Sequence, residues 1–117
     1  MNELGKRGET LAADYLKNTG YIILAANWQF GHKEIDIIAE KDDVLHFVEV
    51  KSRSQYFWVE PKEAVQRKKQ NNIIIAADAY MQRRNESREA SFDIVSIVFF
   101  KDHHTLEFIE NAFEPLF

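Results

Sequence analysis

The chain of 117 residues contains no cysteine. Disulfide bonds and thiolate metal sites are therefore excluded, and a reducing cytoplasm is the expected compartment. No stretch approaches the roughly 20 consecutive apolar residues that span a bilayer, and the start, MNELGKRGE, lacks the apolar core of a secretory signal. We therefore expect a cytoplasmic protein that has no membrane partner.

The sequence also lacks the short motifs of several common enzyme classes. No GxxxxGK[ST], GxGxxG, GxSxG or HExxH pattern occurs, and the histidines have no zinc-ligand spacing. Nucleotide hydrolysis, dinucleotide redox chemistry and serine-hydrolase chemistry consequently have no support.

An overall basic excess is missing as well. The formal net charge is −4 and the pI is about 5.5, which argues against a non-specific nucleic-acid coat. The charges are uneven, however: residues 34–43 hold five acids and one base, whereas residues 62–70 hold four bases and one acid. The basic segment is either a patch that meets a polyanion or simply one solvated face opposite an acidic one.

What the chain does contain is typical of a single globular domain over residues 1–117, with 45% hydrophobic and 29% charged residues. Hydrophobic periodicity predicts seven elements. These are a helix at 3–18, strands at 21–30, 34–40 and 44–52, a helix at 61–84, and strands at 92–100 and 105–111. This order predicts an α/β fold with a central mixed β-sheet flanked by helices.

The stretch HFVEVKS, residues 46–52, carries charge inside an otherwise apolar strand. A strand that is apolar on both faces is usually central and buried, yet Glu49 and Lys51 project from one face, about 7 Å apart. A hairpin to the preceding strand can place Asp36 beside Glu49. Two adjacent carboxylates repel unless a cation lies between them, and an all-oxygen pair suits Mg²⁺ or Mn²⁺.

Two carboxylates, a metal and a lysine are the parts of metal-dependent phosphodiester hydrolysis. The alternative is structural: Glu49 and Lys51 form an ordinary surface ion pair, and Asp36 is a strand-end residue that bonds to nearby backbone. The combination of an acid within one apolar strand, a hairpin-length gap and E-x-K within the next strand favours a site.

Several blocks of the sequence resemble the YraN-like family of small bacterial proteins. The blocks are GKRGETLAADYL, N…EIDIIAE, FVEVKSR, EAVQRKKQ, FDIVSI and IENAF, and they run nearly from end to end. This family is similar to the Holliday-junction resolvases of the restriction-endonuclease-like, PD-(D/E)XK, superfamily. The resemblance implies a restriction-endonuclease-like three-layer fold, with helices on both sides of a mixed sheet, and a nuclease-type metal site.

The resemblance assigns site residues by position. Asp36 takes the place of the first acid of the motif, Glu49 that of the second and Lys51 that of the lysine, while Glu9 matches an additional helical acid of resolvase-like members. In this hypothesis Asp36 and Glu49 bind one or two Mg²⁺ ions, with the backbone carbonyl of Val50 as a further ligand. Glu9 completes or positions the metal shell; the alternative is an exposed rim glutamate.

Two features depart from the family pattern. Ile35 stands where the motif has its proline, and Phe57 is followed by Trp58 where this family usually has a glycine. The second departure concerns the loop after VEVKSR and the way in which a substrate enters. The aromatic run 56–58 either stacks on unpaired bases or closes over an edge of the core.

Basic and polar residues near the motif predict a phosphate-binding rim. The candidates are Arg53, Lys62, Gln66, Arg67, Lys68 and Lys69. Lys69 falls on the inward stripe of its helix, so it either reaches the site or packs its stem on the core.

Together these observations predict a Mg²⁺- or Mn²⁺-dependent DNA endonuclease that acts on branched or otherwise structured DNA. Paired cuts across a junction would call for a homodimer with two-fold symmetry. The rival hypothesis is a non-catalytic nucleic-acid- or protein-binding module with a vestigial nuclease site. A third is a protein-interaction domain with no role on DNA.

Overall fold

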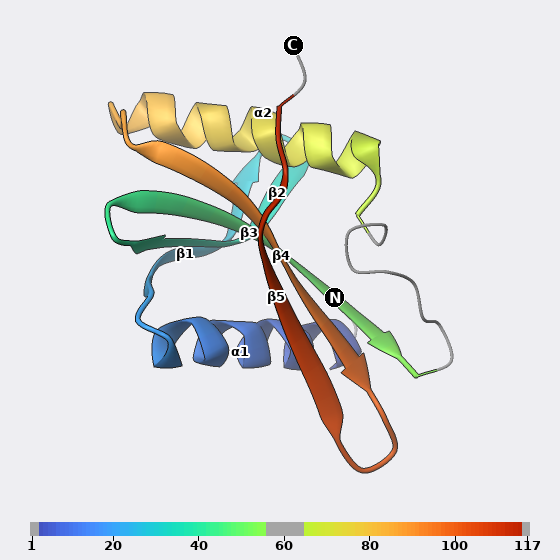
Figure 1. The fold of residues 1–117 in the computed structure, drawn as a ribbon. Helices are drawn as coiled ribbons and strands as arrows, with labels where there is room; N and C mark the ends of the chain where they lie inside the picture. The colour runs from blue at the N-terminus through green and yellow to red at the C-terminus, as the bar shows by residue number, and fades with distance from the viewer. Residues whose placement is uncertain (1–2, 56–64, 116–117) are drawn as a thin grey trace.

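A computed structural model describes residues 3–55 and 65–115 of the chain (Figure 1). Its elements, in chain order, are α1 (Glu3–Asn18), β1 (Ile22–Phe30), β2 (Lys33–Lys41), β3 (Val44–Ser54), α2 (Arg67–Arg83), β4 (Glu89–Phe99) and β5 (His104–Phe113). The seven elements predicted from periodicity are therefore all present. Within the described residues, no helix is long and apolar enough to cross a membrane.

The five strands form one mixed sheet in the order β1-β2-β3-β4-β5. β3 and β4 run parallel, while every other neighbouring pair is antiparallel. A parallel pair needs a crossover connection, and α2 lies in that connection. Figure 1 shows α1 on one face of the sheet and α2 on the other. This arrangement confirms the predicted α/β class and is consistent with the restriction-endonuclease-like three-layer fold.

The turn between β2 and β3 sets the register that builds the site. Asp42 and Asp43 both have positive φ, 51° and 65°, as a two-residue type I′ hairpin loop requires. Aspartate tolerates this conformation better than most residues do. The predicted hairpin is thus confirmed, and its register pairs Ile37 with Val48. The next residues in that register are Asp36 and Glu49.

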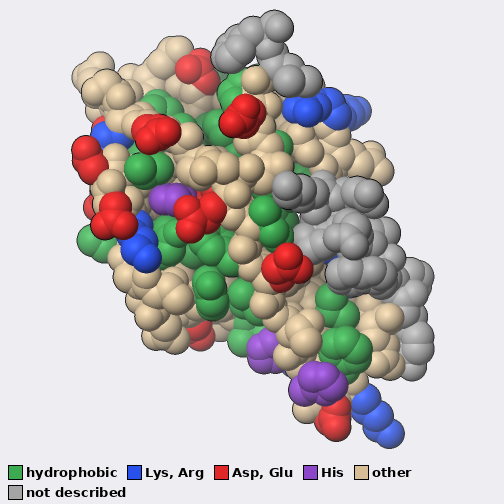
Figure 2. Space-filling model, viewed as in Figure 1, with side chains coloured by type: hydrophobic (Ala, Val, Ile, Leu, Met, Phe, Trp, Pro, Cys, Tyr) green, Lys and Arg blue, Asp and Glu red, His purple; other side chains and the backbone are tan. Residues whose placement is uncertain are grey.

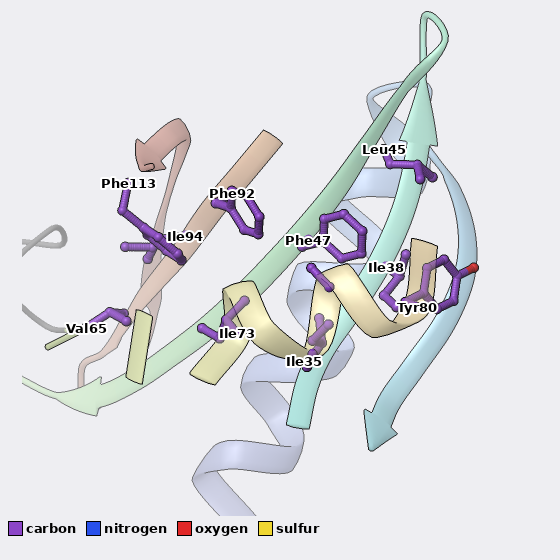
Figure 3. Packing of buried hydrophobic residues seen from close by; sticks show 12 residues of the cluster. Ile35, Ile38, Leu45, Phe47, Val65, Ile73, Tyr80, Phe92, Ile94 and Phe113 are labelled. Atoms are coloured by element: carbon purple, nitrogen blue, oxygen red, sulfur yellow. The ribbon is translucent and has the colours of Figure 1, made fainter. Parts of the chain in front are cut away.

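β3 is buried on both faces, as its doubly apolar sequence predicts. Leu45 and Phe47 belong to the cluster on the α2 side, whereas Val48 belongs to the cluster on the α1 side. Figure 3 shows Ile73 and Tyr80 of α2 among the buried side chains of the first cluster. Phe47 and Tyr80 meet edge to face, with ring centroids 6.0 Å apart. A strand held from both sides is a rigid support for charged residues at its far end.

α1 approaches β3 closely because one of its buried residues is a glycine. Gly8, Ala12 and Leu16 are buried, and a Cβ at Gly8 would overlap Ser52 Oγ. The small side of the helix therefore lies directly on the strand that carries Glu49. Glu9, the next residue after Gly8, is brought to the edge of this contact.

The second helix begins later than predicted. The range 61–84 was expected from Pro61 onward, but Gln66 is extended, with φ −72° and ψ 160°, and α2 starts at Arg67. Val65, which precedes it, is 3% exposed and packs in the core. Its carbonyl accepts a hydrogen bond from Gln70 Nε2 at 2.8 Å. Residues 61–64 lie outside the described residues.

The fourth strand starts three residues earlier than predicted. β4 begins at Glu89 rather than at residue 92, because its first residue already pairs with Val44 of β3. Pairing with a long parallel neighbour therefore extends the strand into a segment whose sequence, EAS, carries no strand signal of its own.

Candidate functional site

Asp36 stands where β2 and β3 stop pairing. The last pair of the ladder is Ile37 with Val48, and beyond it Asp36 Oδ2 accepts a hydrogen bond from the Val50 backbone N–H at 2.8 Å. The carboxylate thus replaces a strand partner and is held between the two strands. The backbone bond expected of a strand-end residue is present, and it fixes Asp36 beside Glu49.

Glu49 is buried without enough partners for its charge. The residue is 7% exposed, and Oε2 lies 3.7 Å from Lys69 Nζ. Oε1 is buried, and no donor of the described residues reaches it. Burial, followed by the charge of Asp36 and a hydrogen bond with it, raises the pKa of Glu49 to about 9, against the opposing effect of Lys69 and Lys51. A proton shared with Asp36 or a bound cation would satisfy Oε1.

Glu9 lies close enough to Asp36 to respond to its charge. Burial and then the charge of Asp36 raise the pKa of Glu9, while a side-chain hydrogen bond with Asn27 lowers it. Asn27 lies between two register pairs, Ala26–Ile37 and Trp28–Ile35, and is therefore opposite Asp36 on β1. Its φ of 51° is a conformation that asparagine adopts more readily than other non-glycine residues. Thus α1 supplies Glu9 and β1 supplies Asn27, and these two polar side chains lie near Asp36.

A cleft of about 420 Å³ opens in front of Glu49 and Lys51. Its lining residues are Glu49, Lys51, Val65, Gln66, Lys68, Lys69 and Asn72. Three lysines therefore face one carboxylate. β3 supplies the acid and one lysine, and the start of α2 supplies the other two. The cleft is locally basic in a protein of net negative charge, which suits an anionic group such as a phosphate.

The residues present fit a hard divalent cation with few protein ligands. Asp36 and Glu49 are two adjacent carboxylates, and the buried, unpartnered Oε1 of Glu49 is an acceptor that lacks a positive charge. Mg²⁺ is commonly bound by one or two carboxylates, with waters and phosphate oxygens in its other positions. The described residues contain no group of three His, Cys, Asp or Glu side chains that could hold a metal ion. Glu9 therefore does not join the other two acids in such a group.

Comparison with known proteins places the chain in a family. The family model described as "Uncharacterised protein family UPF0102" matches residues 8–97. The chain belongs to the UPF0102 family. A UPF0102 protein of Parabacteroides distasonis is 43% identical over 113 residues, which is 97% of this chain and 93% of the relative. One from Clostridium botulinum is 37% identical over 116 residues, which is 96% of this chain and 94% of the relative.

The match to the UPF0102 family confirms the predicted resemblance to YraN-like proteins. The matched segment contains Glu9, Asp36, Glu49 and Lys51, as well as the whole of α2. A third relative, the UPF0102 protein of Bacteroides thetaiotaomicron, is 41% identical over 114 residues, or 97% of this chain and 94% of its own length. The names of these relatives state no activity, so the role of each site residue stays a prediction.

The predicted phosphate rim is brought together only in part. Gln66, Lys68 and Lys69 all line the cleft. Arg53 is instead buried, donates to Ser96 Oγ at 3.0 Å and has a pKa lowered by burial, because β3 carries it inward beside β4.

The other candidates for the rim lie elsewhere. Arg67 is turned toward the carbonyl of Glu114, at 3.5 Å, and it does not line the cleft. Lys62 and the aromatic run 56–58 lie outside the described residues. Within the described part of this UPF0102 chain, the rim thus consists of Gln66, just before α2, and of Lys68 and Lys69 in the first turn of α2.

Two asparagines at the site were missed by sequence reasoning. Asn72 lines the cleft one helical turn after Lys69, a spacing that places both residues on one side of α2. This spacing of three residues could have predicted Asn72 from the sequence alone. Asn27 was contained in the block N…EIDIIAE, but only the register of β1 against β2 places it opposite Asp36.

Proposed function

We propose that this UPF0102 protein is a metal-dependent endonuclease that acts on branched or structured DNA in the cytoplasm. One observation carries the proposal: Glu49, which lies beside the carboxylate of Asp36 and whose buried Oε1 has no donor among the described residues, lines a cleft that also contains three lysines. A purely structural ion pair would not need a second carboxylate at the same point. The acids suit a divalent cation, and the lysines suit the phosphate that such a cation activates.

Asp36 and Glu49 would hold Mg²⁺ or Mn²⁺, with the backbone carbonyl of Val50 as a further ligand. When bound, the ion supplies positive charge at the phosphoryl group and makes a nearby water more acidic. Asp36 is pre-positioned for this role by the Val50 N–H bond. Glu9, which has a hydrogen bond with Asn27 and does not join the two acids as a ligand, would position the shell through its charge near Asp36.

The lysines would act on the substrate directly. Lys51 projects from the same face of β3 as Glu49 and lines the same cleft, so it would orient the attacking water and stabilise the negative charge that develops on the phosphate. Lys69, now 3.7 Å from Glu49, would turn toward a phosphate once a cation neutralises that carboxylate. Lys68 and Gln66 would fix the backbone of the DNA without reading its sequence.

The rival function is a non-catalytic nucleic-acid-binding module that has the fold and a vestigial site. The net charge of −4 favours it, because a protein of net negative charge repels DNA overall and a nuclease must overcome that repulsion. A homodimer would suit either function on a symmetrical DNA junction, because its two clefts would contact two strands related by the same two-fold symmetry.

The deciding experiment measures cleavage and binding separately. A fluorescently labelled four-way junction is incubated with the parent protein, Glu49→Gln, Asp36→Asn and the control Glu107→Gln in Mg²⁺ or Mn²⁺. Glu107 is an exposed acid on β5 outside the cleft. Binding is followed by anisotropy in EDTA, with the double variant Lys68→Glu, Lys69→Glu as the test of the cleft.

An endonuclease would cut with the parent and with Glu107→Gln, and would lose more than about 100-fold in rate with either site variant. Binding without any cutting, lost in the double lysine variant, would support the rival module. If the parent neither cuts nor binds any branched, nicked or single-stranded DNA, both functions are wrong and a protein-interaction role is left.

A further inference from the structure

A second cavity lies at the other end of β3, away from Glu49 and Lys51. Its volume is about 190 Å³, and its lining residues are Tyr21, Lys41, Asp42, Val44, His46, Glu89, Ser91, Glu110 and Asn111. His46 and Glu49 are three residues apart on one strand, so they face opposite sides of the sheet. Figure 2 shows acidic side chains gathered around a histidine and a basic side chain on this side of the molecule.

The cavity has a buried polar floor centred on Asp93. This residue is 0% exposed. Its Oδ2 lies 2.5 Å from His46 Nδ1, and its Oδ1 lies 2.5 Å from Ser91 Oγ and accepts the Asn111 backbone N–H at 3.0 Å. An irregularity in the β4–β5 ladder and the positive φ of Asn111, 51°, aim that N–H at the carboxylate. Both oxygens of Asp93 have partners that can donate, so we assign His46 Nδ1 as the N–H donor to Oδ2.

The remaining ring nitrogen of His46 is therefore presented to the cavity. His46 is 5% exposed and lines the cavity, and its Nδ1 is used by Asp93. Among the described residues, no hydrogen bond involves Nε2. Nε2 is also not one of the polar side-chain atoms that are completely buried and lack a partner. In the tautomer of the imidazole that has its proton on Nδ1, Nε2 offers a lone pair at the base of the cavity. A ligand that bonds to this lone pair supplies an N–H or O–H donor.

The charged residues around the opening favour a ligand that carries positive charge. Asp42, Glu89 and Glu110 line the cavity with one base, Lys41, so three acids face a single cation. The Lys41 ammonium is already engaged, since it donates to the Thr19 carbonyl at 2.7 Å and lies 4.9 Å from the Tyr21 ring centroid. Phosphates are therefore disfavoured here, in contrast to the lysine-lined cleft.

We propose that this cavity binds a small organic cation, an ammonium or guanidinium group, through His46 Nε2 and the carboxylate of Glu110. The volume admits the end of such a molecule and not a whole polymer. The cation comes either from a free amine or from the basic side chain of a peptide, because both present the same donors. The site is separate from the proposed nuclease cleft and does not depend on its activity.

The test uses three probes with the full chain. Agmatine is the free cation, the blocked tripeptide Ac-Gly-Arg-Gly-amide is the peptide side chain, and N-butylurea is a neutral analogue with similar donors. Calorimetry measures affinity, and long-range ¹H–¹⁵N NMR of the histidine ring reports whether Nε2 accepts a hydrogen bond. The variants are Glu110→Gln and His46→Phe, with Glu107→Gln, an exposed acid on the same strand that does not line the cavity, as the matched control.

Saturable agmatine binding that is weakened at least about tenfold in Glu110→Gln, and unchanged in Glu107→Gln, is the expected result. Binding of agmatine alone identifies a free amine, and binding of the tripeptide as well identifies a peptide side chain. Equal affinities of Glu110→Gln and Glu107→Gln would overturn the proposal, as would binding of N-butylurea as tight as that of agmatine, or no saturable binding of either cation. Glu110 is exposed, so its variant tests the site even if His46→Phe does not fold.

Discussion

Replacing Glu49 by glutamine should make the metal-free protein more stable. In the folded chain, burial and Asp36 raise the pKa of Glu49 to about 9, whereas in the unfolded chain this carboxyl titrates near its ordinary value. At about pH 7 the folded state must therefore keep a proton that the unfolded state releases. Glutamine has nearly the same shape and no charge to suppress, so this cost disappears.

The size and sign of the effect follow from linkage. Each unit of pKa difference corresponds to about 1.4 kcal/mol. An acid whose pKa is raised on folding loses stability as pH rises from its unfolded pKa to its folded pKa. We expect Glu49→Gln to gain on the order of 1 to 3 kcal/mol in the free energy of unfolding near neutral pH. The gain should vanish at low pH, where the parent residue is protonated in both states.

Urea unfolding in EDTA checks this expectation at about pH 5 and about pH 8.5. The matched control is Glu107→Gln, an exposed acid on β5. The reasoning is refuted if Glu49→Gln is no more stable than the parent at the higher pH, or if the difference between them does not grow with pH.

Divalent metal should reverse the ranking of the two proteins. A ligand that binds only the folded state adds about 2.7 kcal/mol at a free concentration 100 times its dissociation constant. The parent should gain this increment in Mg²⁺ or Mn²⁺, while Glu49→Gln should gain little. An equal response of both proteins to the metal would place the ion away from Glu49.

Three further predictions follow from the packing and the polar network. Gly8→Ala should cost on the order of 1 to 3 kcal/mol in urea unfolding, because its Cβ would overlap Ser52 Oγ; adding Ser52→Ala should recover part of the loss, and strict additivity would contradict the proposed overlap. Asp93→Asn should cost on the order of 2 to 4 kcal/mol, since it breaks up a fully buried polar network; a change within experimental error would refute this. Asn27→Ala should raise the pKa of Glu9 further in the metal-free protein, because it removes the hydrogen bond that lowers it; carboxyl NMR titration would disprove this if the pKa stayed constant or fell.

Local sequence accounts well for the elements whose signals are local. The type I′ turn at Asp42 and Asp43 and the doubly apolar strand around Phe47 were predictable because turn chemistry and periodicity act over a few residues. The start of α2 was not predictable in this way. Pro61 is a common first helical residue, but Val65 packs in the core ahead of the helix and Gln66 is extended.

The sequence by itself determined the chemistry that the candidate site can have. Asp36, Glu49 and Lys51 were identified from an acid in one strand and E-x-K in the next, because side chains alternate along a strand and a short hairpin limits its register.

Only the tertiary structure decided how these groups are surrounded. The end of the β2–β3 ladder turns Asp36 onto the Val50 N–H, and α2 brings Lys69 to Glu49 across the crossover. The parallel pairing of β3 with β4 joins His46 to Asp93, 47 residues apart in the chain. Burial and long-range contacts of this kind depend on the packing of whole elements, so no local pattern in the sequence encodes them.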